Sequence, residues 1–312
     1  MVKSSLLIHP EELSKKWIDK LADAGVETLA LHPVGGWRAF LTLAEMLEKL
    51  ETPEYRALLD YAAERGLKIE YEMHAGRYLL PADKFEAHPE WFRMTKEGER
   101  KPDRNFCVSN EEALDFVAER AAELAKKLYR STNRYFFWLD DGEEMFCHCE
   151  KCRKLTPSDQ QLIVMNRIVR RLKKDDENAT LAYLAYHETI APPTCVSVDD
   201  GIFLEYAPIK RSPDKPVSVC DEAVHLPLLV STFGKAGAKV LDYWYDNSLY
   251  SNWTKPPKKF TLRREIMKED FGFYKSLGFN DMSSFACYLG ADYDELFGDA
   301  DVSDFGAFAN EE

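Results

Sequence analysis

Long apolar runs, surplus positive charge and low-complexity segments are all missing from this sequence of 312 residues. No run approaches the roughly 18 apolar residues that a membrane span requires. The 41 Lys and Arg residues are outnumbered by 54 Asp and Glu residues, so the net charge is −13. This acidic balance, without a basic stripe, argues against a nucleic-acid partner and against docking on an anionic membrane.

The N-terminal segment has only a short apolar run before His9. A secretory signal needs a longer apolar region and a cleavage site of small residues, so we expect a cytoplasmic protein. Linkers rich in Pro, Gly or Ser are also missing. Because α/β barrels of this length commonly form one domain, we expect a single domain over residues 1–312.

A recurring pattern along the chain indicates the fold. Helical segments end on Gly25, Gly66, Gly237 and Gly278, and a β-rich run begins shortly after each. Glycine readily takes the left-handed conformation that closes a helix, and repeated helix–strand alternation indicates a parallel sheet. Eight strand candidates lie near residues 5–9, 26–32, 67–74, 134–140, 180–187, 202–207, 239–245 and 281–288. They predict an α/β fold, a (β/α)8 TIM barrel, with an open doubly wound sheet as the alternative.

The helices between these strands have recognisable starts. Ser109 followed by Glu112 has the spacing of a capping box. Proline at the first helical position predicts helix starts at Thr52-Pro53 and Thr156-Pro157. The segment after the last strand candidate, DVSDFGAFANEE, is a weak closing helix.

Polar residues gather where the strand candidates end. In barrels the catalytic and binding groups lie at these ends, and polar groups there are costly to bury unless they are paired, which favours a wet, convergent pocket. Aromatic faces nearby suit stacking on sugars. We therefore predict that the substrate-binding residues are His9, His32, His74, His187, Tyr206, Asp242, Trp244 and Asp246.

The fourth strand candidate ends in two adjacent carboxylates, Asp140 and Asp141. Two carboxylates in one pocket can split their pKa values, so that one holds a proton while the other stays charged. Glycosidic bond cleavage requires this division of labour. We predict a catalytic pair drawn from Asp140, Asp141, Glu188 and Glu205. The alternative is that Asp140 or Asp141 only caps the following loop.

The cysteines form one cluster that suits a metal. The chain has seven cysteines, an odd number that does not fit a disulfide scaffold. Cys147, Cys149 and Cys152 fall within six residues, and Cys107 lies in the long segment after the third strand candidate. Four thiolates match a structural zinc site. The alternative is a set of free, partly buried thiols.

Several stretches resemble a known family. They are EMHAGRYLLP, HPEWFRMTKEGER, NFCVSNEEALDFVAERAAEL, LDDGEEMFCHCEKC and LAYLAYHETIAPP. Together they are similar to the domain of unknown function 4838, a group of bacterial glycoside-hydrolase-like barrels, over roughly residues 65 to 290. That group is in turn similar to barrels of the α-glucuronidase and β-N-acetylhexosaminidase kind. The resemblance implies a TIM barrel with an acidic residue after the fourth strand as general acid.

The resemblance also suggests roles for single residues. The adjacent Asp140 and Asp141 look like the double aspartate of family 84 N-acetylglucosaminidases, which implies that Asp140 orients the substrate and Asp141 protonates the leaving oxygen. The similarity to α-glucuronidases points instead to Glu188 or Glu205 as the second carboxylate.

Three hypotheses about function follow. The first is a glycoside hydrolase acting on a small-molecule or oligosaccharide substrate, which needs no cofactor beyond the possible structural zinc. The second is a metal-dependent sugar isomerase, epimerase or lyase, because four strand-end histidines with Glu72, Glu188 and Glu205 suit a divalent ion. The third is a carbohydrate-binding barrel without catalysis.

Overall fold

The computed structural model describes residues 2–311, which form eight strands and eleven α-helices. The strands are β1 (Lys3–Ile8), β2 (Thr28–Leu31), β3 (Lys68–His74), β4 (Arg134–Trp138), β5 (Thr180–Ala185), β6 (Ile202–Tyr206), β7 (Lys239–Asp242) and β8 (Asp281–Phe285). They follow one another in sequence order around a closed barrel, and the registered pairs are parallel. The predicted (β/α)8 barrel is therefore confirmed, and the open sheet is excluded.

One or two α-helices follow every strand except β5, which is followed by a single 3-10 turn at His187–Thr189. The α-helices are α1 (Lys15–Asp23), α2 (Ala39–Leu50), α3 (Pro53–Glu64), α4 (Gly76–Leu79), α5 (Glu111–Ala125), α6 (Pro157–Leu172), α7 (Leu226–Phe233), α8 (Asn247–Tyr250), α9 (Arg264–Leu277), α10 (Ala291–Phe297) and α11 (Ser303–Asn310). The weak closing segment thus forms a helix, α11, whose Phe305 and Phe308 are buried. No helix within residues 2–311 is long and apolar enough to cross a membrane.

The strands are buried along nearly their whole length, as expected for a parallel sheet covered by helices. Each residue of β2, β6 and β7 is buried. All four predicted glycines have positive φ, for example +72° at Gly25 and +95° at Gly278. At Gly25, Gly66 and Gly278 the left-handed backbone turns the chain from a helix toward the next strand. The predicted helix end at Gly237 is displaced, because α7 ends at Phe233 and Gly234 is its C-cap.

One predicted helix start is displaced. The helix α5 is capped by Asn110, whose Oδ1 accepts a hydrogen bond from the backbone N–H of Ala113. The predicted capping box of Ser109 and Glu112 is therefore wrong by one residue. The other two starts are confirmed: α3 begins at Pro53, and the side chain of Thr156 caps α6 with Pro157 in its first turn.

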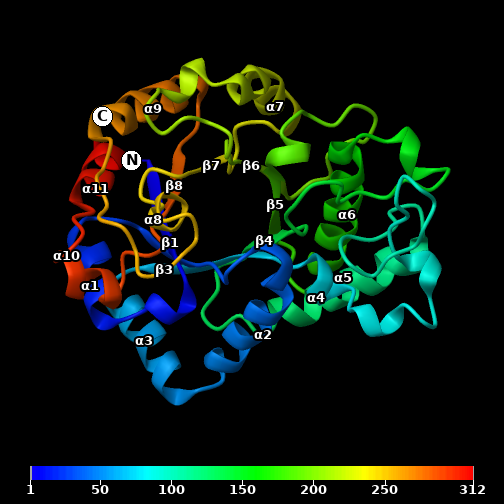
Figure 1. Cartoon of the computed structure of the whole chain (residues 1–312), viewed down its shortest axis with the longest axis horizontal. Helices are drawn as coiled ribbons and strands as arrows, with labels where there is room; N and C mark the ends of the chain where they lie inside the picture. Colours follow the sequence, from blue (N-terminus) through cyan, green and yellow to red (C-terminus); the bar gives the residue numbers. More distant parts are fainter. Residues whose placement is uncertain (1, 312) are drawn as a thin grey trace. The chain divides into compact units, whose positions relative to one another are not determined.

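Contacts group the chain into two compact units. The first contains Met1–His32, Pro53–Glu70 and Leu204–Glu312, and the second contains Pro33–Thr52 and Tyr71–Phe203. In the first, α11 packs on α9 and on β1. In the second, α5 and α6 lie side by side, with α6 against β5 (Figure 1). We describe the two units separately, and the single domain over residues 1–312 stays a prediction.

Candidate active site

The two carboxylates after β4, in the second unit, have different surroundings. Asp140 is buried, and its Oδ2 accepts a hydrogen bond of 2.9 Å from the backbone N–H of Arg77, at the start of α4. Its own backbone N–H donates to Oδ1 of Asn105 at 2.9 Å. Asp140 is thus fastened to two segments that follow β3.

Burial raises the pKa of Asp140 to about 6, even though His74 and the Arg77 backbone act in the opposite direction. Its Oδ1 is buried, with no hydrogen-bond partner among residues 2–311. Gly76 lies directly against it, because a Cβ at that position would be 3.0 Å from the Asp140 carboxyl carbon. Asp140 nevertheless lines the same pocket as its neighbour Asp141.

Asp141 is only half-buried and lines a pocket at the ends of β4 and β5. The hydroxyl of Tyr186 donates to its Oδ1 at 3.1 Å. Tyr186 directly follows the end of β5 and also lines the pocket. His187 and Glu188 were predicted as site residues from the sequence. Tyr186 was not, because a tyrosine in an apolar run resembles a core residue.

Glu188 lines the same pocket. Its Oε2 accepts a hydrogen bond of 3.2 Å from the backbone N–H of Met145. The preceding residue, His187, has φ +49°, an unfavourable conformation for a residue with a side chain. This left-handed turn bends the chain after Tyr186, and it places Tyr186, His187 and Glu188 around one pocket.

His74 ends β3, and its Nδ1 is 2.7 Å from the carbonyl oxygen of Leu139. A carbonyl only accepts, so Nδ1 must carry a proton. In the neutral ring, Nε2 is then the acceptor. The imidazole packs edge-on against Trp138, with its centroid 6.4 Å from the ring of Tyr186. His74 therefore packs against Trp138 and near Tyr186, which lines the β4–β5 pocket.

In the first unit, His9 has an equivalent arrangement at the end of β1. Its Nδ1 is 2.8 Å from the carbonyl oxygen of His32, and the two imidazole centroids are 5.9 Å apart. His9 also belongs to a group with Glu12 and Cys287 whose potential ligand atoms lie within 4.8 Å of one another. Glu12, however, already accepts backbone hydrogen bonds from His9 and Tyr288.

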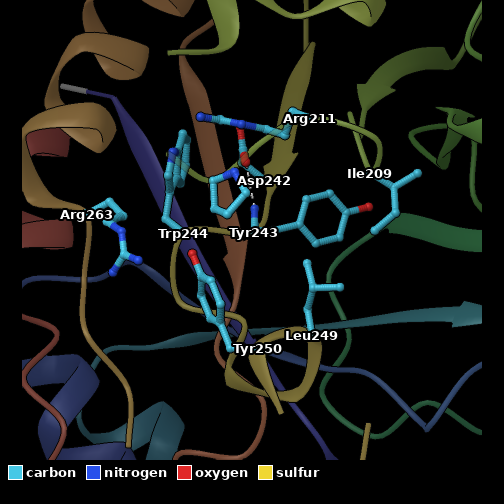
Figure 2. Close-up of a pocket in the computed structure, with 9 residues that line it drawn as sticks. Ile209, Arg211, Asp242, Tyr243, Trp244, Leu249, Tyr250 and Arg263 are labelled. Atoms are coloured by element: carbon cyan, nitrogen blue, oxygen red, sulfur yellow. Dashed lines mark hydrogen bonds and ion pairs between the residues drawn. The ribbon is translucent and has the colours of Figure 1, made fainter. Parts of the chain in front are cut away.

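A second pocket lies at the end of β7. Figure 2 shows the Arg211 guanidinium against the Asp242 carboxylate, with the rings of Tyr243, Trp244 and Tyr250 around them. The Nη1 of Arg211 is 2.6 Å from Asp242 Oδ2. These aromatic and charged groups form a pocket of about 400 Å³, which includes space open to solvent.

The charged groups of this pocket form ion pairs and hydrogen bonds with other buried residues. Arg211 Nη2 is 2.6 Å from Asp270 Oδ2, and the Trp244 indole N–H donates to that same oxygen at 2.8 Å. The hydroxyl of Tyr274 donates to Asp242 at 3.0 Å. Burial and the nearby Asp242 raise the pKa of Asp270. Asp242 and Trp244 line this pocket and also hold the loop after β7 through Arg211 and Asp270, and their predicted binding of substrate stays a prediction.

Three other predicted site residues of the first unit are buried and contact neighbouring parts of the fold. Asp246 caps α8, with its Oδ1 accepting from the backbone N–H groups of Ser248 and Leu249. Tyr206 is completely buried, with its ring edge-on to Tyr274. Glu205 is also completely buried, 3.9 Å from Lys239 Nζ, so a substrate has no access to its carboxylate.

The four predicted cysteines do meet. Cys107, Cys147, Cys149 and Cys152 are all buried, and their sulfur atoms lie within 4.8 Å of one another. Cys107 comes from the loop between β3 and α5, as expected, and the other three come from the loop between β4 and α6.

The fold and the strand-end pockets define the class of this protein. It is a (β/α)8 barrel with acidic groups at the carboxyl ends of its strands. Within that class, the chain belongs to the family described as a domain of unknown function (DUF4838), which matches residues 36–288. The resemblance noted in the sequence is therefore confirmed. No curated protein sequence matches the chain.

Solved structures of similar fold are glycoside hydrolases. A family 5 enzyme from Prevotella bryantii, in complex with a xyloglucan tetradecasaccharide, has a TM-score of 0.51 at 10% identity, over 96% of this chain and 86% of that one. A family 20 module of a pneumococcal exo-β-D-N-acetylglucosaminidase gives 0.51 at 12% identity, over 99% and 82%. A β-galactosidase from a psychrophilic Marinomonas gives 0.55 at 12% identity, over 98% and 59%. Identities this low show the fold alone.

Proposed function

We propose that this protein is a glycoside hydrolase that acts on a carbohydrate in the β4–β5 pocket, with Asp141 as the general acid. One observation carries the proposal: Asp141 and Glu188 line the same pocket, and the hydroxyl of Tyr186 holds the Asp141 carboxyl group. Two carboxyl groups around one pocket are the minimum that glycosidic bond cleavage requires.

The surroundings of each carboxyl group support separate roles. Asp141 is half-buried and accessible, so a leaving oxygen can approach it. Asp140 lines the same pocket but is nearly buried, and the backbone N–H of Arg77 fixes its carboxyl group, so it orients the substrate. Glu188 is the second carboxylate, either as a base that activates water or as a nucleophile. Glu205 is left out because its carboxylate is completely buried.

The role assigned to Asp141 requires that this carboxyl group hold its proton at the working pH, as any general acid must. The solved barrels of similar fold are supporting evidence, since those proteins are described as glycoside hydrolases or β-galactosidases.

The second candidate function is a metal-dependent sugar isomerase, epimerase or lyase. The group of His9, Glu12 and Cys287 favours it. The hydrolase fits better, because both oxygens of Glu12 already accept backbone hydrogen bonds. These backbone hydrogen bonds hold Glu12 as part of the turn after β1, which accounts for its burial without a metal ion.

The experiment compares aryl glycosides with good and poor leaving groups in the wild type and in Asp141→Asn. The amide is nearly isosteric but does not donate a proton to the leaving oxygen. Proton transfer typically contributes about 10²–10⁴-fold. We expect a loss of that size for the poor leaving group and a much smaller loss for the good one. Asp115→Asn, an exposed aspartate on α5, is the control and should leave both rates unchanged.

Equal losses for both leaving groups would show that Asp141 is not the acid and would transfer that role to Glu188. A wild-type protein that cleaves no glycoside, but converts a free sugar only with an added divalent ion, would replace the hydrolase by the second candidate.

A further inference from the structure

The cysteine cluster joins two loops of the second unit. Cys107 lies between β3 and α5, and Cys147, Cys149 and Cys152 lie between β4 and α6. We propose that these four cysteines bind one zinc ion as a structural site, which fastens the loop after β4 to the loop after β3.

The sulfur positions match a tetrahedral zinc ion. A Zn–S bond of about 2.3 Å places the corners of a tetrahedron roughly 3.8 Å apart. Cys107 Sγ lies 3.7 Å from Cys149 Sγ and 3.9 Å from Cys152 Sγ. A disulfide would require about 2.05 Å, so the sulfur atoms are spaced for a shared ion and not for a covalent bond.

The groups around the sulfur atoms suit thiolates. The backbone N–H of Met94 donates to Cys147 Sγ at 3.3 Å, and Arg100 Nη1 lies 3.8 Å from that sulfur. Ser109 Oγ is 3.2 Å from Cys107 Sγ and 3.4 Å from Cys149 Sγ. Four thiolates around Zn²⁺ carry a net charge of about −2, which such donors stabilise. A purely apolar packing of thiols would gain nothing from a guanidinium.

A second set of contacts fixes the loop that carries three of the ligands. The backbone N–H of Cys147 donates to Gln160 Oε1 at 3.0 Å. Gln160 Nε2 donates to the carbonyl oxygens of Cys147 and Cys152, at 3.1 and 3.2 Å. Contacts of this kind orient metal ligands before the ion binds. With four protein ligands no coordination position is left for water, so the site is structural rather than catalytic.

The site connects to the carboxylates after β4 by short lengths of chain. Asn105, two residues before Cys107, accepts a hydrogen bond from the backbone N–H of Asp140. Cys147 follows Asp141 by six residues. An ion bound to Cys107 and Cys147 therefore fixes the segments on both sides of the aspartate pair. This holds whether or not the β4–β5 pocket is a glycosidase site.

The first experiment measures metal content in the intact chain, purified without added metal or chelator. We expect about one zinc ion per chain. Cys149→Ser should lose it, and Cys149 is the best choice because it is the most exposed of the four, at 8%. Cys195→Ser is the matched control, since Cys195 is exposed and outside the cluster. Zinc that persists in Cys149→Ser and Cys147→Ser would overturn the proposal.

A second measurement needs no variant and decides the matter if Cys149→Ser fails to fold. Cobalt exchanged into the wild-type chain should give the thiolate-to-metal and visible absorption bands of a tetrahedral, sulfur-rich site. A thiol reagent should react with the four cysteines of the cluster only after a chelator is added, whereas Cys287, buried outside the cluster, stays unmodified in both cases. No cobalt bands with the cluster thiols reactive in the native chain, or a red iron chromophore in place of zinc, would overturn the proposal. Neither readout depends on enzymatic activity.

Discussion

Two strand-end aspartates, Asp141 after β4 and Asp242 at the end of β7, were selected on the same ground and have different surroundings. Asp242 is buried, and it accepts hydrogen bonds from Arg211 and Tyr274. Asp141 is half-buried beside a pocket and accepts a hydrogen bond from Tyr186. Position at a strand end identifies polar residues as candidates for a site. The contacts of each residue then indicate whether it stabilises a loop or is accessible from a pocket.

The largest effect in this comparison should come from Arg211→Met, which removes the guanidinium between Asp242 and Asp270. Leaving buried carboxylates without their cation costs about 3–5 kcal/mol. We expect the free energy of unfolding to fall by that amount, measured by urea denaturation. Arg263→Met is the control, because its ion pair with Asp214 is exposed and should be worth less than about 1 kcal/mol. Similar losses in both variants would mean that Asp242 and Asp270 do not depend on Arg211 for stability.

The next effect concerns pH and Asp140. Its ordinary pKa is 3.8 and its folded pKa is about 6, so between these values the folded state binds the proton and the unfolded state releases it. The free energy of unfolding should therefore fall as pH rises from 4 to 7, by about 3 kcal/mol from this group.

Asp140→Asn should remove that part of the pH dependence. The measurement is urea unfolding of both proteins at pH 4.5 and 7.5, with the difference between proteins taken at each pH. An identical pH dependence in wild type and variant would show that Asp140 does not gain a proton on burial.

A smaller effect is expected from Gly76→Ala. A Cβ at Gly76 would be 2.7 Å from Asn105 Oδ1 and 3.0 Å from the Asp140 carboxyl carbon. Overpacking of this kind costs about 1–3 kcal/mol, and it should also lower activity by displacing Asp140. Gly272→Ala is the control, since nothing lies near its Cβ position in α9, and a helical alanine should stabilise the protein by about 0.5–1 kcal/mol. Thermal unfolding of the two variants would give shifts of opposite sign, and a shift of the same sign would contradict the close packing.

The smallest effect separates the two tyrosines that donate to these aspartates. Tyr186→Phe should reduce kcat/KM about tenfold with little change in stability, because one charge-assisted hydrogen bond is worth roughly 1.5 kcal/mol. Tyr274→Phe should do the reverse, lowering the free energy of unfolding by about 1–3 kcal/mol while leaving kcat/KM unchanged. Matching effects on activity would remove the distinction between Asp141 and Asp242.

Much of the barrel was predictable, because its signals are local. Gly25 and Gly278 take the left-handed conformation that their place after a helix predicts. The cap of α5 was displaced by one residue because Ser109 and Asn110 are both good caps, and Ser109 lies against the sulfur of Cys107 instead.

The partners of the strand-end carboxylates were harder to predict. Arg211 lies in the irregular segment between β6 and α7, which has no periodicity to mark a residue that reaches β7. Tyr186 was hidden for a different reason, since its ring resembles the apolar residues before it. The polar residues at a strand end can be read from the sequence. Their charges, however, are neutralised by residues far away along the chain, as Arg211 neutralises Asp270.

Closure of the sheet has a consequence for recognition. Because β1 pairs with both β2 and β8, the strands of residues 2–311 present no free edge of unpaired backbone groups. An extended peptide, or a second copy of the chain, has no edge to which it can add a strand. A partner of this protein must therefore be recognised by helices, loops and side chains and not by addition of a strand.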